Sequence, residues 1–402
     1  MVIKIAKSPL EGLIVIDFAT LIAAPIVAKF LGDFGADVIK VEQPKLGDPN
    51  RFTQIYTKDK NPAWLDDARN KKTITLDLHK LEGQEIAKRL CQKADIALFN
   101  FRPGILEKWN LDPIKLHEIN PNLIICLVTA YGQTGPKKSK GGFDRTVSAY
   151  AGITYTSGYP EHPPVRTRYP LVDFLTGYLG AFAVMTALYN RDVNNKGGEV
   201  IDLSLAEAAF VATGGSLSRY SAYKNIEERT GNRINFFVPS ENFGTLDGKI
   251  ITFNAGTEKL WQQLVLAMDK KDLLENKKFK TYIARISNQD ELYEIIGNWI
   301  KNKTSEEVIE ILDKAGVPCE KINNIADIVN DSHFWERGSI LEVNDDKLGK
   351  LLVKGVIPKF KNNPGSIRFL GAGLGEYNNE VYRDLIGLNP EEIKELKDKK
   401  VI

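Results

Sequence analysis

Residues 12–42, GLIVIDFATLIAAPIVAKFLGDFGADVIKVE, decide the fold. The run LIVIDF at 13–18 is short, apolar and β-branched, which is typical of a buried parallel strand. Pro25 begins a helical stretch, IVAKFLGDFG, and DVIKVE at 37–42 predicts a second strand. Because strand–helix–strand crossovers are right-handed, we expect the two strands to be neighbours in one parallel sheet.

The same alternation continues downstream and predicts a doubly wound α/β domain. Further strands are expected at 74–78, 96–99, 123–129 and 200–203, and a long helix at 173–191. Beyond residue 229 the pattern changes. The expected elements there are a strand within 246–253, mostly amphipathic helix at 258–315 with a capping box at Thr304 or Ser305, a hairpin at 340–360 and a closing helix at 390–400.

Composition narrows the function classes. The 402 residues carry 54 basic and 52 acidic side chains, a net charge of +2, so no global field favours nucleic acid or an anionic membrane. The three cysteines are sparse and unpaired in sequence, which fits a reducing compartment; Cys126, in the run LIICLV, is expected in the core. No histidine spacing indicates a metal site.

The N-terminus has no signal-peptide pattern, and the longest apolar segment, 179–189, is short for a bilayer, so we expect a soluble cytoplasmic protein.

A dinucleotide-binding dehydrogenase is the first alternative for a chain that begins in this way. The turn DFATLIAAP lacks the GxGxxG fingerprint, and GAGLG at 371–375 does not join a strand to a helix. Glu42 stands where such folds place an acid on the ribose, but it is equally explained as a solvated strand end. The motif therefore does not support a dehydrogenase.

Several segments read together carry more information than any one of them. In order, they are PLEGLIVIDF, GDFGADVIKVEQP, ARNKKTITLDL, ALFNFRPGILEKWNL, AYGQTGPKKSKGGFDRTVSAYAG, LVDFLTGYLGAFAVMTAL, AGVPCEKINNIADI and LGEYNNEVYRDLIGL. From residue 9 to the C-terminus, their order and spacing resemble the class III coenzyme A-transferases. This CaiB/BaiF group includes formyl-CoA and carnitine-CoA transferases, and also 2-methylacyl-CoA racemases.

The resemblance implies an interlocked homodimer in which each subunit is a ring threaded through the other. It implies a large Rossmann-like domain built from both chain ends and a small α+β domain. On this chain the parts are expected at 1–205 (large domain), 206–229 (linker), 230–325 (small domain), 326–345 (linker) and 346–402 (return to the large domain). The implied partners are an acyl-CoA and a carboxylic acid, with coenzyme A as substrate and no permanently bound cofactor.

Asp173 occupies the position of the family's catalytic aspartate. From the residues alone it is an aspartate in the first turn of a helix, where the dipole favours the carboxylate, and a plain helix cap explains it as well. The resemblance implies that its carboxylate attacks the thioester. The reaction would then pass through an aspartyl anhydride and an aspartyl-CoA thioester.

Coenzyme A brings several phosphates, which need Lys, Arg or amide N–H partners. Basic candidates occur in RNKK (Arg69, Lys71, Lys72), in FNFRPGILEK and in KKSKGGFDR, which contains Lys137 and Lys138. By position, the family's coenzyme A contacts carry over to Ile22, Ala23, Leu76, Asp77, Leu78, His79, Asn100, Phe101, Arg102, Lys108, Lys140, Gly141, Phe143 and Asp144.

Two departures from the family patterns bear on the activity. Racemases pair the aspartate with a histidine in a GHDINY-like segment, whereas this chain has GGFDRTV with Phe143 at that place. Two-base proton exchange needs the second base, so a racemase is the weaker alternative, beside a non-catalytic CoA-binding protein. NFFVPSENFGTLDG lacks the GGGG-like loop of formyl-CoA transferases, which favours a larger or more apolar acyl group than formyl or oxalyl.

Overall fold

The predicted strand–helix–strand unit begins a six-stranded parallel sheet in the computed structural model. The strand order is β3-β2-β1-β4-β5-β6, so the winding direction reverses between β1 and β4. This is the doubly wound arrangement, in which ligands bind at the carboxyl ends of the strands beside the reversal. The strands are β1 (Ile14–Asp17), β2 (Asp37–Glu42), β3 (Lys71–Thr75), β4 (Ile96–Phe99), β5 (Ile124–Thr129) and β6 (Glu199–Ser204).

The structure describes residues 8–53, 60–233 and 236–402. The N-terminal residues 1–7, for which the sequence predicts no signal peptide, lie outside the described residues. The chain forms two compact units. The first combines 1–154, 166–225 and 333–402, and the second combines 155–165 and 226–332. The domain boundaries expected from the sequence stay a prediction.

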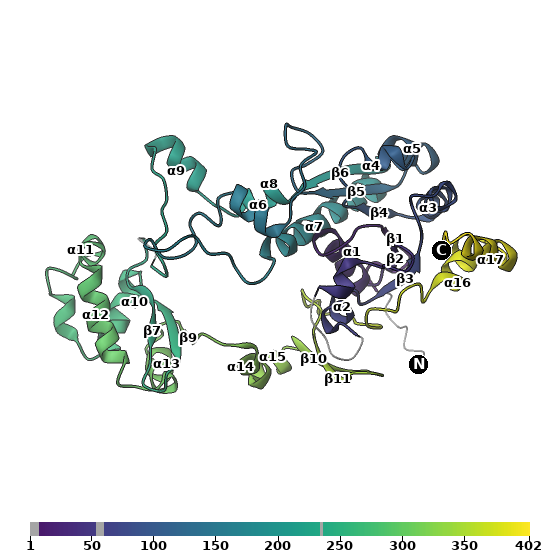
Figure 1. The fold of residues 1–402 in the computed structure, drawn as a ribbon. Coiled ribbons are helices and arrows are strands. Elements are labelled where there is room, and N and C mark those ends of the chain that lie inside the picture. Colours follow the sequence, from purple (N-terminus) through teal and green to yellow (C-terminus); the bar gives the residue numbers. More distant parts are fainter. Residues whose placement is uncertain (1–7, 54–59, 234–235) are drawn as a thin grey trace. The chain divides into compact units, whose positions relative to one another are not determined.

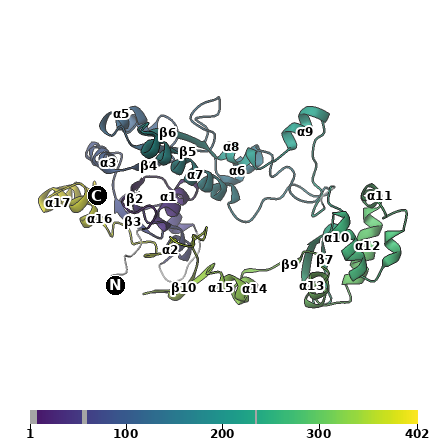
Figure 2. The same ribbon diagram turned by 180° about the vertical axis from the view of Figure 1, so that it is seen from behind.

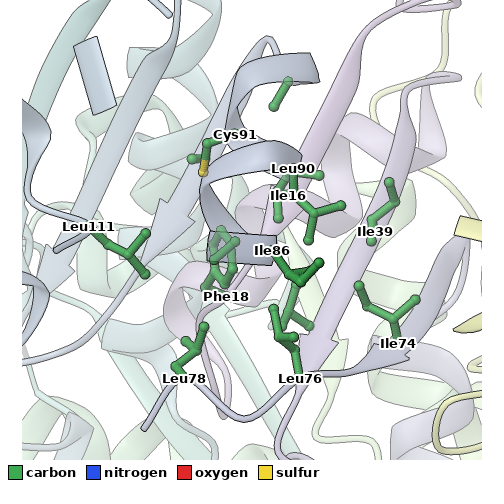
Figure 3. Close-up of a cluster of buried hydrophobic side chains, with 14 of the residues drawn as sticks. Ile16, Phe18, Ile39, Ile74, Leu76, Leu78, Ile86, Leu90, Cys91 and Leu111 are labelled. Carbon is green, nitrogen blue, oxygen red and sulfur yellow. The ribbon is translucent and has the colours of Figure 1, made fainter. Parts of the chain in front are cut away.

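Alternation along the strands gives the sheet two buried faces. Val15 and Val38 pack with the helices α1 (Ala23–Asp33) and α7 (Leu171–Asn194), which lie together on one face (Figures 1 and 2). Ile16 and Ile39 point to the opposite face and pack under α3 (Leu81–Lys93), as Figure 3 shows. Burial on both faces explains why β1, β4 and β5 are continuous apolar runs.

Shorter helices connect the strands of this unit. They are η1 (Pro49–Phe52), α2 (Pro62–Asp67), α4 (Ile105–Lys108), α5 (Pro113–Ile119), α6 (Asp144–Tyr150), α8 (Leu205–Val211) and α9 (Ser216–Tyr223). Asparagine and aspartate caps begin several of them: Asp48, Asn61 and Asp112 each accept a backbone N–H and are each followed by proline at the first helical position.

The C-terminal segment returns to the sheet beside β3, as the yellow and purple parts of Figure 1 show. Asn378 accepts the Thr75 N–H at 2.8 Å, and the buried Tyr382 hydroxyl donates to the Thr75 carbonyl at 2.5 Å. The helix α14 (Ile325–Asn330) precedes this segment and belongs to the second unit. The segment itself begins at α15 (Ser332–Glu336) and contains the antiparallel hairpin β10 (Ile340–Asp345) and β11 (Gly349–Lys354), α16 (Asn378–Glu380), the π-helical turn η3 (Val381–Leu385) and α17 (Pro390–Asp398). The predicted hairpin and closing helix are confirmed.

The second unit has its own core, with Trp261, Phe279 and Leu292 buried at its centre. Its elements are the antiparallel strands β7 (Ser240–Gly244), β8 (Ile250–Asn254) and β9 (Cys319–Lys321), and the helices α10 (Glu258–Ala267), η2 (Lys271–Leu274), α11 (Tyr282–Ser287), α12 (Gln289–Ile300) and α13 (Ser305–Lys314). The predicted capping box begins α13: Thr304 accepts the Glu307 N–H, and Glu307 accepts the Thr304 N–H.

Two sequence expectations need correction. The strand expected at 74–78 lies at 71–75, because the charged residues Lys71 and Lys72 take sheet positions and the apolar run after Thr75 is a loop. The helix expected at 173–191 runs over 24 residues, which by length and composition could cross a bilayer. Its buried residues pack on α1 and the sheet, so α7 is a partly buried core helix of a soluble protein.

Candidate active site

A cavity of about 550 Å³ opens at the carboxyl ends of β1, β4 and β5. Three strand-end loops build its wall: Thr20 to Ala23 after β1, then Asn100, Arg102 and Pro103 after β4, and Val128 to Ala130 at the end of β5. Asp173, in the first turn of α7, completes the lining together with the turn around Gly141. The cavity therefore lies beside the winding reversal, where doubly wound sheets bind their ligands.

Asp173 is not the cap of its helix. The N-terminus of α7 is capped from another element, because Asp144 Oδ2 accepts the Val172 N–H at 2.8 Å and lies 3.4 Å from the Asp173 nitrogen. Asp144 is the first residue of α6, so one carboxylate ties the starts of two helices together. Among the described residues, no hydrogen bond reaches the carboxylate of Asp173, which leaves its oxygens free to face the cavity.

The electrostatics of Asp173 differ from the sequence expectation. We expected the helix dipole to favour the carboxylate, but burial, and secondarily the negative charge of Asp144, raise the pKa of Asp173 to about 7. Desolvation outweighs the dipole because no described donor compensates the loss of water. A carboxylate with this pKa is ionised above neutrality and is more nucleophilic than an ordinary surface aspartate.

Three cationic side chains share the cavity with Asp173: Arg102, Lys138 and Lys140. The Arg102 guanidinium lies against Gly141, so closely that a Cβ there would meet Nη2 at 2.4 Å. Any larger residue at 141 would displace Arg102. Next to them, Lys137 Nζ sits 4.5 Å from the ring centre of Tyr150, a cation–π contact that anchors the same turn.

The structure brings together nine of the residues expected from the sequence. One cavity is lined by Ile22, Ala23, Asn100, Arg102, Lys138, Lys140, Gly141, Phe143 and Asp173. The remaining residues do not line it. Leu76 and Leu78 are core residues, Asp77 accepts the His79 N–H, and His79 and Phe101 pack edge-on against Trp109 at 5.4 and 4.8 Å. Lys108 ends the neighbouring helix α4.

Comparison with known proteins decides what kind of enzyme this cavity belongs to. The family model described as CoA-transferase family III matches residues 10–376. The chain belongs to CoA-transferase family III. The succinyl-CoA–L-malate CoA-transferase beta subunit of Chloroflexus aurantiacus is 38% identical over 398 residues, 98% of each chain. The succinyl-CoA–D-citramalate CoA-transferase of the same organism is 36% identical over 98% of each chain.

The solved structures agree with this assignment. The crystal structure of a CaiB/BaiF family protein from Brucella suis superposes with a TM-score of 0.84 at 28% identity, covering 94% of this chain and 100% of that one. The α/β fold with its six-stranded parallel sheet is thus the fold of the family. The chain is a CoA-transferase, and its substrates are acyl-CoA thioesters.

Some lining residues of this transferase were missed by the sequence analysis. They are Thr20, Leu21, Pro103, Val128, Thr129, Ala130, Gly142, Thr146 and Leu205. Val128 to Ala130 could have been found, because they stand at the carboxyl end of a predicted strand next to the reversal. Leu205 could not, since its place depends on how α8 packs after β6.

Three charged candidates of the transferase have other roles. Arg69 is buried in ion pairs with Asp33 and Asp66, and Lys71 is buried against Asp17, so neither can bind coenzyme A phosphates. Lys72 pairs with Asp37 and Glu380 at the sheet edge.

The sequence allowed Glu42 to be a solvated strand end. In the structure Glu42 is 3% exposed and accepts two hydrogen bonds of 2.7 Å from Arg51. That explanation is wrong.

Proposed function

We propose that the Asp173 carboxylate is the nucleophile of this CoA-transferase. The environment of the Asp173 carboxylate carries the proposal. Asp173 lines the cavity at the winding reversal and receives no hydrogen bond from the described residues. Its pKa is raised to about 7. A half-buried carboxylate without donors is poorly stabilised as an anion, and bond formation to an acyl carbon removes its charge. The family match supports the same role for this position.

The proposed transfer passes through two mixed anhydrides and one aspartyl-CoA thioester on Asp173. The carboxylate attacks the thioester carbonyl, the C–S bond breaks, and the CoA thiolate leaves a mixed anhydride on Asp173. The thiolate attacks the aspartyl carbonyl, which releases the donor acid and forms an aspartyl-CoA thioester. The acceptor carboxylate then attacks that thioester, giving a second anhydride, and the thiolate returns to the acceptor carbonyl and frees Asp173. Apolar walls such as Val128 and Leu205 exclude water from the anhydride stages.

The substrates we propose are succinyl-CoA as donor and a four- or five-carbon dicarboxylic acid as acceptor. The names of both Chloroflexus aurantiacus relatives contain succinyl-CoA and a dicarboxylic acid. Arg102, Lys138 and Lys140 offer positive charge to a second carboxylate as well as to coenzyme A. The relatives support the expectation of an acyl group larger than formyl, rather than a more apolar one.

The predicted contacts outside the cavity extend the coenzyme A site. Leu76 to His79 follow β3, so they leave the sheet at the same carboxyl edge as the cavity loops. The aromatic cluster of His79, Phe101 and Trp109 offers faces for the adenine. Lys108, next to Trp109 in the chain, and Asp144, at the start of α6, remain candidates. A Lys108→Ala variant should weaken coenzyme A binding without changing the identity of the acid transferred.

The test is a matrix of acyl-CoA donors against carboxylic acid acceptors, followed by mass spectrometry of products. Succinyl-CoA with malate, citramalate or glutarate should be among the best pairs; formyl-CoA with oxalate as the best pair would contradict the substrate proposal. Borohydride or hydroxylamine added during turnover should modify Asp173. Transfer with no modification at Asp173 would contradict the nucleophile.

Two other activities are weaker on specific grounds. A racemase needs a second base, and Phe143 lines the cavity where the racemase pattern has histidine. A binder without catalysis would not need an uncompensated carboxylate in its cavity. Deuterium uptake at the α-carbon without an acceptor acid would favour the racemase, and coenzyme A binding without any transfer would favour the binder.

We also propose the interlocked homodimer. The outer face of α7 exposes an apolar stripe at spacings of three, four and seven residues: Leu171, Tyr178, Phe182, Met185, Tyr189 and Val193. Helix α9 exposes Leu217, Tyr220 and Tyr223. Contiguous apolar surface of this kind on a soluble protein marks an interaction face, and a second copy of the chain would cover it.

Mass in solution and chain topology test the dimer separately. Light scattering should give twice the 45.0 kDa of one chain, and Phe182→Glu should lower that mass. If the rings interlock, ligating the N- and C-termini of each chain should produce a linked dimer that survives denaturing electrophoresis. A dimer that falls apart after ligation is not interlocked.

The cytoplasm is the proposed location. Cys91, Cys126 and Cys319 are free and buried, and burial raises the pKa of each thiol to about 12. None is therefore suited to catalysis or to a disulfide, which fits a reducing compartment. Cys126 lies in the core, as the sequence predicts.

A further inference from the structure

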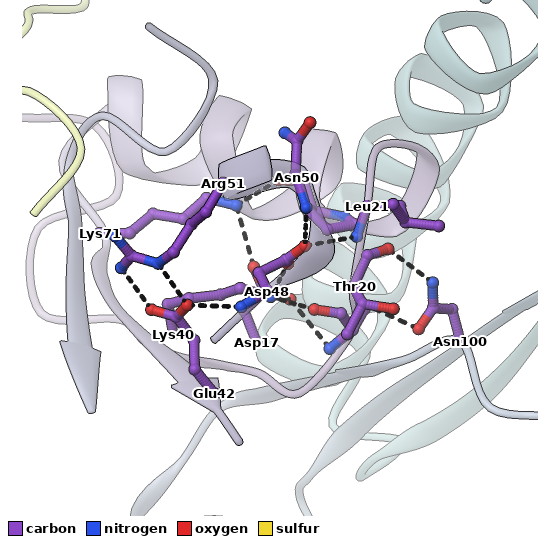
Figure 4. Close-up of polar contacts among 12 residues, drawn as sticks. Asp17, Thr20, Leu21, Lys40, Glu42, Asp48, Asn50, Arg51, Lys71 and Asn100 are labelled. Carbon is purple, nitrogen blue, oxygen red and sulfur yellow. Dashed lines mark hydrogen bonds and ion pairs between the residues drawn. The ribbon is translucent and has the colours of Figure 1, made fainter. Parts of the chain in front are cut away.

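The loop between β1 and α1 is held by side chains from β1, from β2, from the segment after β2 and from the residue that follows β4, as Figure 4 shows. It forms part of the cavity wall through Thr20, Leu21 and Ile22. Its backbone hydrogen bonds are Ala19 N to Asp17 Oδ1 (3.1 Å), Thr20 N to Asn100 Oδ1 (3.0 Å), Asn100 Nδ2 to Thr20 O (2.8 Å), Leu21 N to Asp48 Oδ1 (3.0 Å) and Lys40 Nζ to Ala19 O.

Leu21 adopts a left-handed backbone conformation, with φ at +67°. Doubly wound folds that bind dinucleotides use glycine in this loop, where such conformations carry no steric penalty. For leucine the conformation carries a steric penalty, because Cβ comes close to the following carbonyl oxygen. The left-handed conformation persists here because Asp48 accepts the Leu21 N–H. The next residues, Ile22 and Ala23, line the cavity wall. When surrounding groups hold a strained backbone conformation at a cavity wall, the position of that wall is important for function.

The groups that enforce it are acidic and basic side chains in the core of the unit. Asp17, Lys40, Asp48 and Lys71 are each at most 1% exposed. Lys40 Nζ lies 2.9 Å from Asp48 Oδ2, and Lys71 Nζ lies 2.9 Å from Asp17 Oδ2 and 2.6 Å from the Pro25 carbonyl of α1. Burial alone would raise the pKa of Asp48, but Lys40 and the backbone N–H donors outweigh it and lower that pKa. Buried ion pairs add little stability over apolar packing, so their value here is positional.

We propose that Asp48 is a positioning residue of the transfer reaction: through Leu21 it fixes the β1–α1 wall against which the acyl group reacts with Asp173. The inference rests on the proposed function, because it needs Asp173 as the reacting group. Asp48 itself does not line the cavity. Lys40 and Lys71 act through the same network, on the Ala19 and Pro25 carbonyls.

The variant Asp48→Asn tests the proposal without creating a cavity. One carboxylate oxygen of Asp48 pairs with Lys40 Nζ, and the other accepts the Leu21 and Asn50 N–H groups. Asparagine has only one acceptor oxygen, so it cannot serve both sides. At a temperature where the variant is folded, aspartyl-CoA formation in a single turnover with succinyl-CoA should slow about tenfold or more. Coenzyme A affinity should change less than about threefold, because the change acts after binding.

Two further variants separate positioning from plain stability. Asp33→Asn is the matched control: Asp33 is equally buried and pairs with Arg69 and Asn70 at the far end of α1, so it should lower the melting temperature and leave the single-turnover rate within about threefold. Leu21→Gly in the Asp48→Asn background should recover much of the lost rate, because glycine adopts the left-handed conformation unaided.

Equal rate losses for Asp48→Asn and Asp33→Asn, or no recovery with Leu21→Gly, would overturn the proposal. If Asp48→Asn does not fold, hydrogen exchange on the wild-type protein decides. The amides of residues 19–21 should exchange as slowly as those of β1, and exchange as fast as that of an exposed loop would overturn it. A wild-type protein that forms no aspartyl-CoA would instead contradict the proposed function and leave the loop geometry untouched.

Discussion

Two aspartates at the same edge of the sheet, Asp48 fully buried and Asp173 half-buried, have opposite environments. Asp48 pairs with Lys40 and accepts two backbone N–H groups, and these partners hold its pKa below the usual range. Asp173 accepts no hydrogen bond from the described residues, has the carboxylate of Asp144 nearby, and has its pKa raised to about 7. The chain therefore compensates the carboxylate that holds a loop and leaves uncompensated the one that faces the cavity.

The difference has a physical meaning. Compensation lowers the energy of a carboxylate and makes it unreactive, so the Asp48 network holds the wall in place. A carboxylate without partners keeps its lone pairs available and gains when its charge is removed by acylation. If this contrast is right, neutral substitutions at the two positions should have different and partly opposite consequences.

The largest expected effect is the loss of transfer in Asp173→Asn. The amide cannot form the anhydride, so the rate should fall by about 10³-fold or more, while coenzyme A binding stays because the amide is isosteric. Steady-state transfer from succinyl-CoA and titration with coenzyme A measure the two quantities. An Asp173→Asn protein with full activity would remove Asp173 from the reacting side of the comparison.

Stability should respond with opposite signs at the two sites. The lowered pKa of Asp48 contributes stability above its unfolded value and loses it in acid, so Asp48→Asn should destabilise by about 3–5 kcal/mol at pH 8. The raised pKa of Asp173 means that the folded state binds more protons, so wild-type stability falls as pH rises from about 4 to about 7.

Asp173→Asn lacks that loss and should therefore be more stable than wild type at pH 8. The rise from 3.8 to about 7 corresponds to about 4 kcal/mol, which partial solvent access reduces to about 1–3 kcal/mol. Near pH 4 the two proteins should be equally stable. Urea unfolding of wild type and both variants at pH 4 and pH 8 measures this, and destabilisation of Asp173→Asn at pH 8 would refute the assignment of an uncompensated carboxylate.

The pH dependence of the rate tests the same pKa by a different route. Only the ionised Asp173 attacks, so the single-turnover rate should rise about tenfold per pH unit below about 7 and level off above it. The rate at pH 5 should be about 100-fold below the plateau. Product release must not limit the measurement, so aspartyl-CoA is quantified by mass spectrometry in acid-quenched samples. A midpoint near 4 would show that Asp173 is as well compensated as an exposed aspartate.

Much of the fold followed from the sequence because its signals are local. Strands form within the apolar runs at 13–18 and 123–129, and the helix expected at 173–191 forms but extends to Leu171–Asn194, since periodicity depends on neighbours in the chain. The strand expected at 74–78 was misplaced because Lys71 is buried by an ion pair with Asp17, 54 residues away. No local pattern reveals a partner at that distance.

The site divides in the same way. The resemblance named Asp173 and the turn at 140–144, and the structure places Lys140, Gly141 and Phe143 around one cavity with it. The environment of Asp173 could not be foreseen, because it depends on Asp144 from another helix and on the depth of burial. The Asp48 network was invisible for the same reason: its members come from four separate strands and loops.

The smallest expected effects are at Asp144, which both caps α7 and adds charge beside Asp173. Asp144→Asn keeps an oxygen that can accept the Val172 N–H, so the helix start and the melting temperature should stay nearly unchanged. The negative charge is gone, so the pKa of Asp173 and the midpoint of the pH–rate profile should move to lower pH.

Asp144→Ala removes the cap as well and should destabilise by about 1 kcal/mol. It should also let the first turn of α7 fray, so the plateau rate should fall, whereas Asp144→Asn should keep it. Single-turnover profiles and thermal melts of the two variants measure charge and cap independently. If both variants leave the midpoint in place, burial alone sets the pKa of Asp173, and the contrast with Asp48 comes from the missing hydrogen-bond donors rather than from a neighbouring charge.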